Sequence, residues 1–413
     1  MADVHVDVLV VGGGQGGATS AILLRQLGFA GSIAIVGDEP FLPYDRPPLS
    51  KEYLAGEKPF ERMLFKSAQQ WTDFGVAIQL GRRVLAIDAS ARTATCDDGR
   101  TIGYSDLIWA AGGTARRLAC AGSDMKGVHT IRGRADVDRL REELPEVERA
   151  VIVGGGYIGL EAAAVLARLA VPVAVVEALP RLLARVSGEE LSRFYEAEHL
   201  AHGVELRLGA SVRTIEHDGG RVTGVRLSDG SLIPAQLVVV GIGIDPEAGV
   251  LAAAGAEVVD GVRVDEFCRT SLPHVYAVGD CAAHRNPYAG GEWIRLESVQ
   301  NANDQAATAA RSICGQPQPY DAVPWFWSNQ YDLRLQTVGI ARGFDTLVVR
   351  GDPAARSFSV IYLREGHVAA LDCVNAPRDY AQGKALVINR AEVAGTDIAD
   401  PRTPLKSLLP ASA

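Results

Sequence analysis

Two stretches of the chain repeat one order of apolar and polar positions. Residues 8–11 and residues 150–153 are runs of four apolar residues, and each run leads directly into a glycine-rich segment. Apolar residues at helical spacing follow, ending at Gly28 in the first copy. A short, mostly apolar run comes next, at residues 32–36 and 173–176. The pattern predicts two strand–helix–strand units, which are typical of α/β domains with parallel sheets.

Both glycine-rich segments fit the spacing G-x-G-x-x-G. The six glycines are Gly12, Gly14, Gly17, Gly154, Gly156 and Gly159. Glycine makes up 44 of 413 residues, so this spacing preceded by four apolar residues is expected by chance only about 0.02 times per chain. The first glycine permits a tight turn, the second lets a pyrophosphate approach the backbone, and the third allows close helix packing. The sequence therefore predicts two dinucleotide sites.

An acidic side chain follows the second strand of each unit. Asp38 and Glu39 occupy this place in the first unit and Glu177 in the second. An acid about 20 residues beyond the turn can accept hydrogen bonds from ribose hydroxyls. Glu177 would repel a 2′-phosphate and so favours NADH over NADPH, although Arg181 nearby leaves NADPH open. Two such sites suggest a flavin in one and a nicotinamide nucleotide in the other, with electrons passing between them.

The pattern changes after Pro324. Short strand-like runs are expected at residues 333–340, 346–349, 357–363 and 367–374, and a helix at residues 379–390. These elements predict an α+β domain with an antiparallel sheet. The order of motifs then predicts an interrupted arrangement: an FAD domain from residues 1–112 and 246–322, an NAD domain from residues 113–245, and a C-terminal domain from residues 323–413.

Composition narrows the class of protein. The formal net charge of −9 speaks against nucleic acid or an anionic membrane as partner. No apolar run approaches the ~18 residues of a membrane helix, and the acidic start has no basic leader, so we expect a cytoplasmic protein. The six cysteines have no metal-ligand spacing, and residues 39–51 contain none. We therefore expect no metal site, no iron–sulfur centre in this chain and no thiol-based mechanism.

Further segments resemble known flavoproteins. Residues 106–113 and 270–280 are similar to strands of the glutathione-reductase-like two-dinucleotide flavoproteins, with Ala111 where Thr is usual. Residues 43–51 (PYDRPPLSK), 295–299 (RLESV) and 324–328 (PWFWS) resemble the ferredoxin reductases of bacterial oxygenase systems, the putidaredoxin reductase and biphenyl dioxygenase reductase group. The similarity runs from Val8 to Lys406. It implies two Rossmann-like domains followed by the C-terminal α+β domain.

The resemblance also implies the site residues. For FAD they are Gly12, Gly14, Gln15, Gly16, Gly17, Asp38, Glu39, Arg46, Lys51, Val84, Ala110, Arg132, Asp280, Val299 and Trp327. For NAD they are Gly154, Gly156, Tyr157, Ile158, Gly159, Glu161, Glu177, Gly241 and Gly243. The implied catalytic residues are Lys51, Glu161, Glu297 and Trp327.

The resemblance gives three of these residues a role. Lys51 would donate to the flavin, Glu161 would face the nicotinamide and could pair with Lys51, and Trp327 would lie near the flavin edge. By residue type alone other readings stay open. Residues 45–48 also suit a stiff surface turn, Glu161 a charge that favours a helix N-terminus, and Trp327 a core position.

The implied activity is that of an NADH-dependent ferredoxin reductase. Hydride would pass from NADH to FAD, and single electrons to an acidic [2Fe–2S] ferredoxin serving a haem monooxygenase or a ring-hydroxylating dioxygenase. The alternatives are a rubredoxin reductase, an NADH oxidase, or an NADH-sensing flavoprotein resembling apoptosis-inducing factor. We expect a monomer or weak homodimer. Because an acidic partner is repelled by a chain at −9, a basic patch is also expected, with Arg311, Arg334 and Lys406 as candidates.

Overall fold

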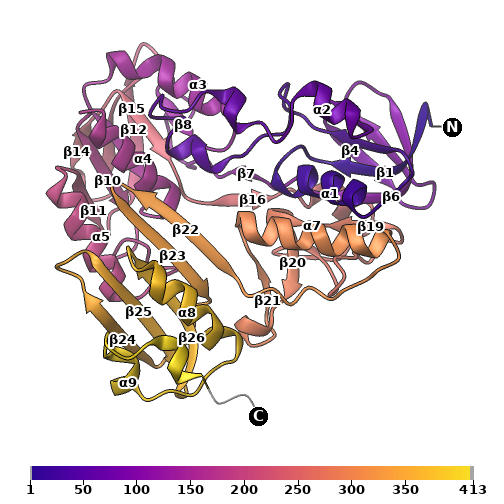
Figure 1. Cartoon of the computed structure of the whole chain (residues 1–413). Coiled ribbons are helices and arrows are strands. Elements are labelled where there is room, and N and C mark those ends of the chain that lie inside the picture. Colours follow the sequence, from indigo (N-terminus) through magenta and orange to yellow (C-terminus); the bar gives the residue numbers. More distant parts are fainter. Residues whose placement is uncertain (1, 410–413) are drawn as a thin grey trace. The chain divides into compact units, whose positions relative to one another are not determined.

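The computed structural model describes residues 2–409, which fall into two compact units. Unit 1 consists of Met1–Arg46, Phe60–Thr114 and Ile244–Ala322, within the described range. Unit 2 consists of Pro47–Pro59, Ala115–Gly243 and Val323–Ala413, again within that range. Figure 1 shows the chain coloured along its sequence, with many of the elements of both units labelled. The predicted division into three domains stays a prediction, and each unit is described by itself.

A seven-stranded sheet forms the centre of unit 1. Its order is β3-β2-β1-β6-β5-β4, with β19 also paired to β6. The strands are β1 (Val4–Val11), β2 (Ile33–Val36), β3 (Val76–Gln79), β4 (Val84–Asp88), β5 (Thr93–Cys96), β6 (Thr101–Trp109) and β19 (Val275–Ala277). Strands β1, β2, β3, β6 and β19 run parallel, whereas β4 and β5 form an antiparallel extension. The parallel part brings the carboxyl ends of β1 and β6 together, where ligands bind in sheets of this kind.

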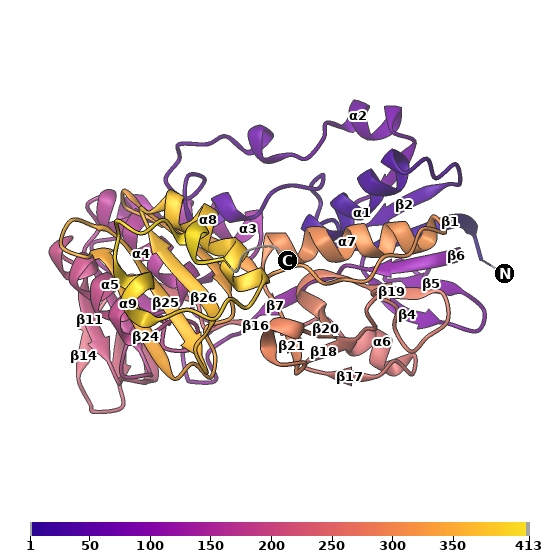
Figure 2. The same cartoon turned by 60° about the horizontal axis from the view of Figure 1, so that its bottom comes forward.

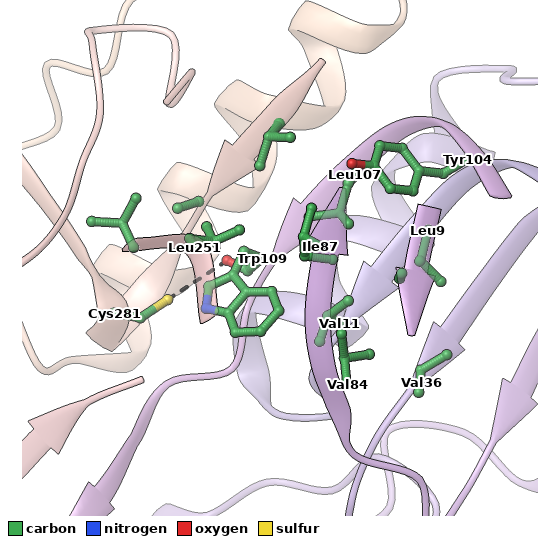
Figure 3. Packing of buried hydrophobic residues seen from close by; sticks show 14 of the residues in the cluster. Leu9, Val11, Val36, Val84, Ile87, Tyr104, Leu107, Trp109, Leu251 and Cys281 are labelled. Atoms are coloured by element: carbon green, nitrogen blue, oxygen red, sulfur yellow. Dashed lines mark hydrogen bonds between the residues drawn. The ribbon is translucent and has the colours of Figure 1, made fainter. Parts of the chain in front are cut away.

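Both faces of this sheet are buried. Alternate residues of β1 point to opposite sides: Leu9 and Val11 belong to one apolar cluster, and Val8 and Val10 to another. The first cluster is drawn in Figure 3, where the thiol of Cys281 donates to the carbonyl oxygen of Trp109 over 3.6 Å. A strand buried on both faces reads as a continuous apolar run, which explains the sequence of β1.

Helices α1 (Gln15–Gln26) and α7 (Val299–Ile313) of unit 1 lie side by side (Figure 1). A four-stranded sheet completes the unit, in the order β17-β18-β20-β21 (Figure 2). The remaining elements of the unit are α2 (Ala68–Asp73), α6 (Gly249–Ala253), β16 (Ile244–Pro246), β17 (Val258–Val259), β18 (Gly261–Arg263), β20 (Ala282–Arg285) and β21 (Trp293–Arg295). Strand β16 pairs with β7 (Gly113–Ala115), whose first two residues belong to this unit.

Unit 2 contains a second parallel sheet, in the order β11-β10-β9-β15-β8. A three-stranded antiparallel sheet, β12-β13-β14, follows in the chain. The elements of this part are β8 (Val128–Thr130), α3 (Arg134–Glu143), β9 (Ala150–Val153), α4 (Tyr157–Arg168), β10 (Val173–Glu177), α5 (Glu189–Ala201), β11 (Glu205–Leu208), β12 (Val212–Asp218), β13 (Arg221–Leu227), β14 (Leu232–Pro234) and β15 (Leu237–Val240). The second predicted strand–helix–strand unit is thus β9, α4 and β10.

Unit 2 ends in a five-stranded antiparallel sheet, in the order β22-β23-β26-β25-β24. Figure 2 shows α8 beside this sheet, and it packs on β23 and β26. The elements are β22 (Trp325–Gln330), β23 (Leu333–Gly339), β24 (Thr346–Asp352), β25 (Ser357–Arg364), β26 (His367–Val374), α8 (Pro377–Ile388) and α9 (Gly395–Ala399).

Most of the predicted elements are confirmed. The helix predicted at residues 379–390 begins two residues earlier, because Pro377 suits the first turn of a helix, and it also ends two residues earlier, at Ile388. Strand β22 was not predicted, since its buried face carries the polar residues Ser328 and Gln330. Within residues 2–409, no helix has the length and apolar character needed to cross a bilayer.

Candidate cofactor and redox site

The first glycine-rich turn joins β1 to α1 and has a backbone that only glycine permits. Gly12 has φ +109°, and a Cβ there would lie 2.3 Å from the carbonyl oxygen of Ala110. A Cβ on Gly17 would lie 1.9 Å from the carbonyl oxygen of Gly12. At Gly14, in contrast, the nearest atom to a Cβ is Nε of Arg46, at 3.6 Å. The turn is thus closed at its first and third glycines, as a pyrophosphate cradle requires.

Charged side chains gather beside this turn. Arg46 forms an ion pair with Glu39, and the hydroxyl of Tyr44 donates to the same carboxylate over 2.6 Å. Asp280 also acts on Arg46 electrostatically. A guanidinium next to Gly14 suits a diphosphate, and Glu39 stands where a ribose acid is expected. Asp38, the other predicted acid, is exposed.

The other residues of unit 1 predicted to bind FAD lie at several places in its sheet and helices. Ala110 directly follows β6, and Val84 begins β4 as part of the apolar cluster drawn in Figure 3. Val299 is the first residue of α7, and Gln15 of α1 donates to Asn303 of α7 over 2.7 Å. Gly16 is buried between Val278 and Ala302. The predicted catalytic Glu297 is exposed and forms an ion pair with Arg295 at 2.6 Å.

The second glycine-rich turn, in unit 2, repeats this geometry. Gly154 has φ +110°, and a Cβ there would lie 2.3 Å from the carbonyl oxygen of Gly241. A Cβ on Gly159 would lie 2.2 Å from the carbonyl oxygen of Gly154. At Gly156 nothing lies within 4 Å, so the space above this residue is open. The open position at the start of α4 fits the pyrophosphate of a nucleotide.

The acid of the second unit lies against its turn. Glu177 accepts hydrogen bonds from the backbone N–H groups of Gly155, at 2.6 Å, and Leu179, at 2.7 Å. Within residues 2–409, no ion pair is found between Arg181 and Glu177. Its guanidinium donates to Ser187 and to the carbonyl oxygen of Ala184. Gly243, with φ +101°, and Gly241 follow β15 on the same edge of the sheet.

Lys51 and Glu161 form a buried ion pair in unit 2. Nζ of Lys51 lies 2.6 Å from Oε2 of Glu161, and the two side chains are 12% and 3% exposed. The hydroxyl of Ser50 donates to Oε2 over 2.5 Å, and that of Ser328 donates to Oε1 over 2.7 Å. The predicted pairing is thus present. The carboxylate is held by three donors, one of them charged, which is how a buried charge is made tolerable.

Aromatic side chains of β22 lie close to the start of α4. The ring of Tyr157 is 4.7 Å from that of Phe326, measured between centroids. Trp327 is half-buried, with its ring 5.7 Å from that of Trp325. Ile158 is 47% exposed at the first turn of α4. The first two turns of α4 thus contain three predicted NAD-binding residues, Tyr157, Ile158 and Glu161.

Sequence reasoning missed Ser50 and Ser328 as partners of Glu161. Ser50 lies in the segment PYDRPPLSK, and Ser328 lies in the segment PWFWS. Hydroxyls so far apart in sequence carry no periodic signal. The presence of both in the segments that resemble the family was the one available hint.

Three of the residues predicted to bind FAD, Lys51, Arg132 and Trp327, belong to unit 2. Their contact with a flavin stays a prediction. All six cysteines are free thiols. Within residues 2–409, no group of His, Cys, Asp or Glu side chains is arranged to hold a metal ion.

Comparison with known proteins gives the family. Residues 6–306 match the family model described as pyridine nucleotide-disulphide oxidoreductase, and residues 325–409 match the reductase C-terminal model. The chain is 59% identical to the 5,5′-dehydrodivanillate O-demethylase ferredoxin reductase subunit of a Sphingobium species, over 98% of each chain. It is 57% identical to a ferredoxin–NAD(P)+ reductase of a Sphingomonas species, over 99% of each chain.

A solved structure gives the same result. The covalent complex of putidaredoxin reductase with putidaredoxin contains a chain that is 36% identical, with a TM-score of 0.94. The match covers 99% of this chain and 98% of that one. The predicted fold class and the predicted family are therefore confirmed. The chain belongs to the pyridine nucleotide-disulphide oxidoreductase family and, within it, to the ferredoxin–NAD(P)+ reductases of oxygenase systems.

Proposed function

We propose that this protein takes hydride from NADH through a bound FAD and passes single electrons to an acidic [2Fe–2S] ferredoxin that serves an oxygenase. The observation that carries the proposal is the pair of matching glycine-rich turns, each closed at its first and third glycines and followed by an acid. Two dinucleotide cradles in one chain suit electron transfer between two cofactors.

A bound flavin supplies the redox chemistry, since it accepts a hydride and gives up electrons one at a time. The chain's own residues bind and orient. In unit 1, Gly14 and the N-terminus of α1 receive the diphosphate, with Arg46 beside them. In unit 2, Gly156 and α4 receive the diphosphate of the nicotinamide nucleotide. Glu161 lies one turn into α4, so the ion pair with Lys51 is proposed to lie at the nicotinamide end of that nucleotide.

NADH is proposed as the preferred nucleotide because of Glu177. Its carboxylate lies at the end of β10, where a ribose hydroxyl can donate to it and a 2′-phosphate would be repelled. Arg181, the charge that could favour NADPH, already donates to Ser187, Ser192 and Ala184. Its guanidinium is therefore already bonded to the segment between β10 and α5 and to α5 itself.

Steady-state rates with the two nucleotides test this preference. We expect kcat/KM to be higher with NADH than with NADPH. Replacing Glu177 by Gln removes the negative charge and keeps one of its two acceptor oxygens, so it should bring the kcat/KM values for NADH and NADPH closer together. A higher kcat/KM with NADPH for the unaltered protein contradicts the assignment.

The proposed acceptor is an acidic [2Fe–2S] ferredoxin, because relatives that are 59% and 57% identical to this chain carry the names of ferredoxin reductases. One of these relatives is the reductase subunit of a 5,5′-dehydrodivanillate O-demethylase, so the oxygenase served is proposed to act on an aromatic compound. We also propose the cytoplasm as the compartment, where reduced nicotinamide is supplied and thiols stay reduced. A monomer or a weak homodimer is proposed as the working form.

An acceptor panel tests the proposed function. Purified protein with FAD is mixed with NADH and, in separate anaerobic assays, with a [2Fe–2S] ferredoxin or a rubredoxin, and aerobically with oxygen alone. We expect the ferredoxin to give the highest turnover. A high rate with oxygen alone would make the protein an oxidase, and a higher rate with rubredoxin a rubredoxin reductase. Slow flavin reduction with NADH-driven dimerisation would favour the NADH-sensing alternative.

A further inference from the structure

A chain of buried polar side chains leads away from Glu161 within unit 2. Ser328 and Gln330 are alternate residues of β22, so both side chains leave the strand on one face. That face meets His199 near the end of α5. Tyr331 comes from the turn after β22. The side chains of Ser328, Gln330 and His199 are at most 1% exposed.

Four hydrogen bonds join these groups to the carboxylate of Glu161. Oγ of Ser328 lies 2.7 Å from Oε1 of Glu161, and Nε2 of Gln330 lies 3.2 Å from Oγ of Ser328. Nε2 of His199 lies 2.9 Å from Oε1 of Gln330. The hydroxyl of Tyr331 lies 2.9 Å from Nδ1 of His199.

The charge of Glu161 fixes the direction of every one of these bonds. An ionised carboxylate only accepts, so the hydroxyl of Ser328 must donate to it. Ser328 then accepts from the NH₂ group of Gln330, which turns the amide oxygen toward His199. Because that oxygen only accepts, Nε2 of His199 carries the proton. Nδ1 is then the acceptor, and Tyr331 donates to it.

We propose that Ser328, Gln330, His199 and Tyr331 form a one-directional hydrogen-bond chain that positions Glu161, with His199 held as the neutral Nε2–H tautomer. The proposal rests on the proposed function, in which Glu161 and Lys51 lie at the nicotinamide. The proposal adds positioning residues to that site. The two farthest from Glu161 are His199, in α5, and Tyr331, in the turn after β22.

The chain positions the carboxylate rather than moving protons. An amide in the middle, Gln330, does not relay protons as hydroxyls and imidazoles do. The donors of all four hydrogen bonds point toward Glu161, so each bond polarises the next one and supports the negative charge of the carboxylate. Oε1 is thereby occupied by Ser328, which leaves Oε2 facing Lys51 and Ser50. Loss of the chain would free the carboxylate to rotate away from Lys51.

Burial supports a neutral His199. Removal from water lowers the pKa of this imidazole to about 4, although the hydrogen bond to Gln330 acts in the opposite direction. The ring of His202, which stacks on Tyr331 at 3.6 Å between centroids, lies beyond the chain toward solvent. A proton on His199 would remove the acceptor that Tyr331 uses.

The kinetic test uses a matched pair of variants at the first link. Ser328→Ala removes the donor, and Ser328→Thr keeps a hydroxyl. In the flavin-loaded full chain, we expect Ser328→Ala to slow flavin reduction by NADH about tenfold with little change in the Kd for NAD+, since a hydrogen bond to a charged group is lost. Ser328→Thr should recover most of the rate. Tyr195→Phe, on the same helix as His199 but removing a hydroxyl that has no partner within residues 2–409, is the control and should leave the rate unchanged.

A double-mutant cycle separates positioning from general damage. With Glu161→Gln the charge that orders the chain is gone, so adding Ser328→Ala should cost less than twofold more. Equal tenfold losses in both backgrounds would overturn the proposal. So would equal rates for Ser328→Ala and Ser328→Thr.

The tautomer of His199 gives a readout independent of activity. ¹⁵N spectra of histidine-labelled holoprotein at pH 7.5, assigned by the signal lost in His199→Phe, should show a proton on Nε2 and none on Nδ1. Should His199→Phe not fold, the assignment rests on the signal that is displaced in Tyr331→Phe and is still present in His202→Asn, because Tyr331 contacts both rings. A proton on Nδ1 would overturn the proposal. Because neither measurement involves an acceptor, failure to reduce ferredoxin would count against the proposed function alone.

Discussion

One buried carboxylate lies at the centre of the polar contacts described in unit 2. Glu161 is 3% exposed and is bonded to Lys51, Ser50 and Ser328. An isolated buried charge costs several kcal/mol, whereas a charge with a full set of donors is tolerated. The ion pair therefore constrains the stability of this unit and, in the proposed function, the nicotinamide site.

Removal of Lys51 should expose this dependence. We predict that Lys51→Met lowers the free energy of unfolding by about 3 kcal/mol, because Glu161 is left buried without its cation. The double variant Lys51→Met/Glu161→Gln should recover most of that loss, since no charge is then buried alone. Urea unfolding measures both, and a double variant as unstable as the single one would contradict this account.

Asp372 should make stability depend on pH. Burial raises the pKa of this carboxyl to about 7, against hydrogen bonds from Tyr362 and Ser187 that lower it. The folded state then holds more protons than the unfolded state between about pH 4 and 7, so this group's contribution to stability falls as pH rises through that window.

Asp372→Asn removes this contribution. Relative to the unaltered protein, the variant should gain stability as pH rises from 4 to 7, by an amount of the order of 4 kcal/mol at most. Taking the difference between the two proteins removes the opposite slope expected from His199 and His284, whose pKa values burial lowers to about 4. A difference that does not change with pH would refute the prediction.

At the scale of elements, the two glycine-rich turns are built alike. In both, the first and third glycines are closed in by backbone carbonyl oxygens. The middle glycines differ, because Gly14 lies near Arg46 whereas Gly156 has open space around it. In the second turn, a substitution at Gly156 can therefore affect nucleotide binding without affecting the fold.

We predict opposite results for two alanine substitutions there. Gly156 has φ −85° and ψ 177°, which alanine adopts readily, so Gly156→Ala should keep the melting temperature. Its methyl group would occupy the space of the diphosphate and raise the KM for NADH at least tenfold. Gly159→Ala forces a collision with the carbonyl oxygen of Gly154, so it should lower the melting temperature as well. Calorimetry and steady-state kinetics measure both, and a Gly156→Ala variant with unchanged KM would count against the cradle.

Sequence patterns predicted the elements better than the links between them. The apolar runs of β1 and β9 stand out because both faces of each strand are buried. Strand β22 has polar residues on its buried face and was missed. The pair formed by Lys51 and Glu161 was anticipated only through family resemblance, since 110 residues separate its members. The chain through Gln330 and His199 had no signal, because its bonds are set by packing between α5 and β22.

At the scale of the whole molecule, charge governs the encounter with the proposed partner. A net charge of −9 would repel the proposed acidic ferredoxin at long range, so we expect local cations to steer it. Of the three predicted candidates, Arg334 and Lys406 are exposed, and Arg311 is half-buried in the last turn of α7.

Charge reversal tests these candidates. We predict that Arg334→Glu and Lys406→Glu each lower kcat/KM for ferredoxin severalfold at low salt, and that this loss shrinks as salt screens the charges. Lys126→Glu makes the same change in net charge at another exposed lysine and should have a smaller effect. If all three substitutions lowered kcat/KM for ferredoxin equally, net charge alone would explain the loss, and Arg334 and Lys406 would not be docking residues.

The most direct test of the account is an anaerobic titration of the FAD-loaded protein with NADH in the presence of a [2Fe–2S] ferredoxin. Because NADH carries two electrons and the ferredoxin accepts one, we predict two ferredoxins reduced for each NADH consumed, with catalytic amounts of the protein sufficient. A ferredoxin that stays oxidised while the bound flavin is reduced by NADH would contradict the central claim.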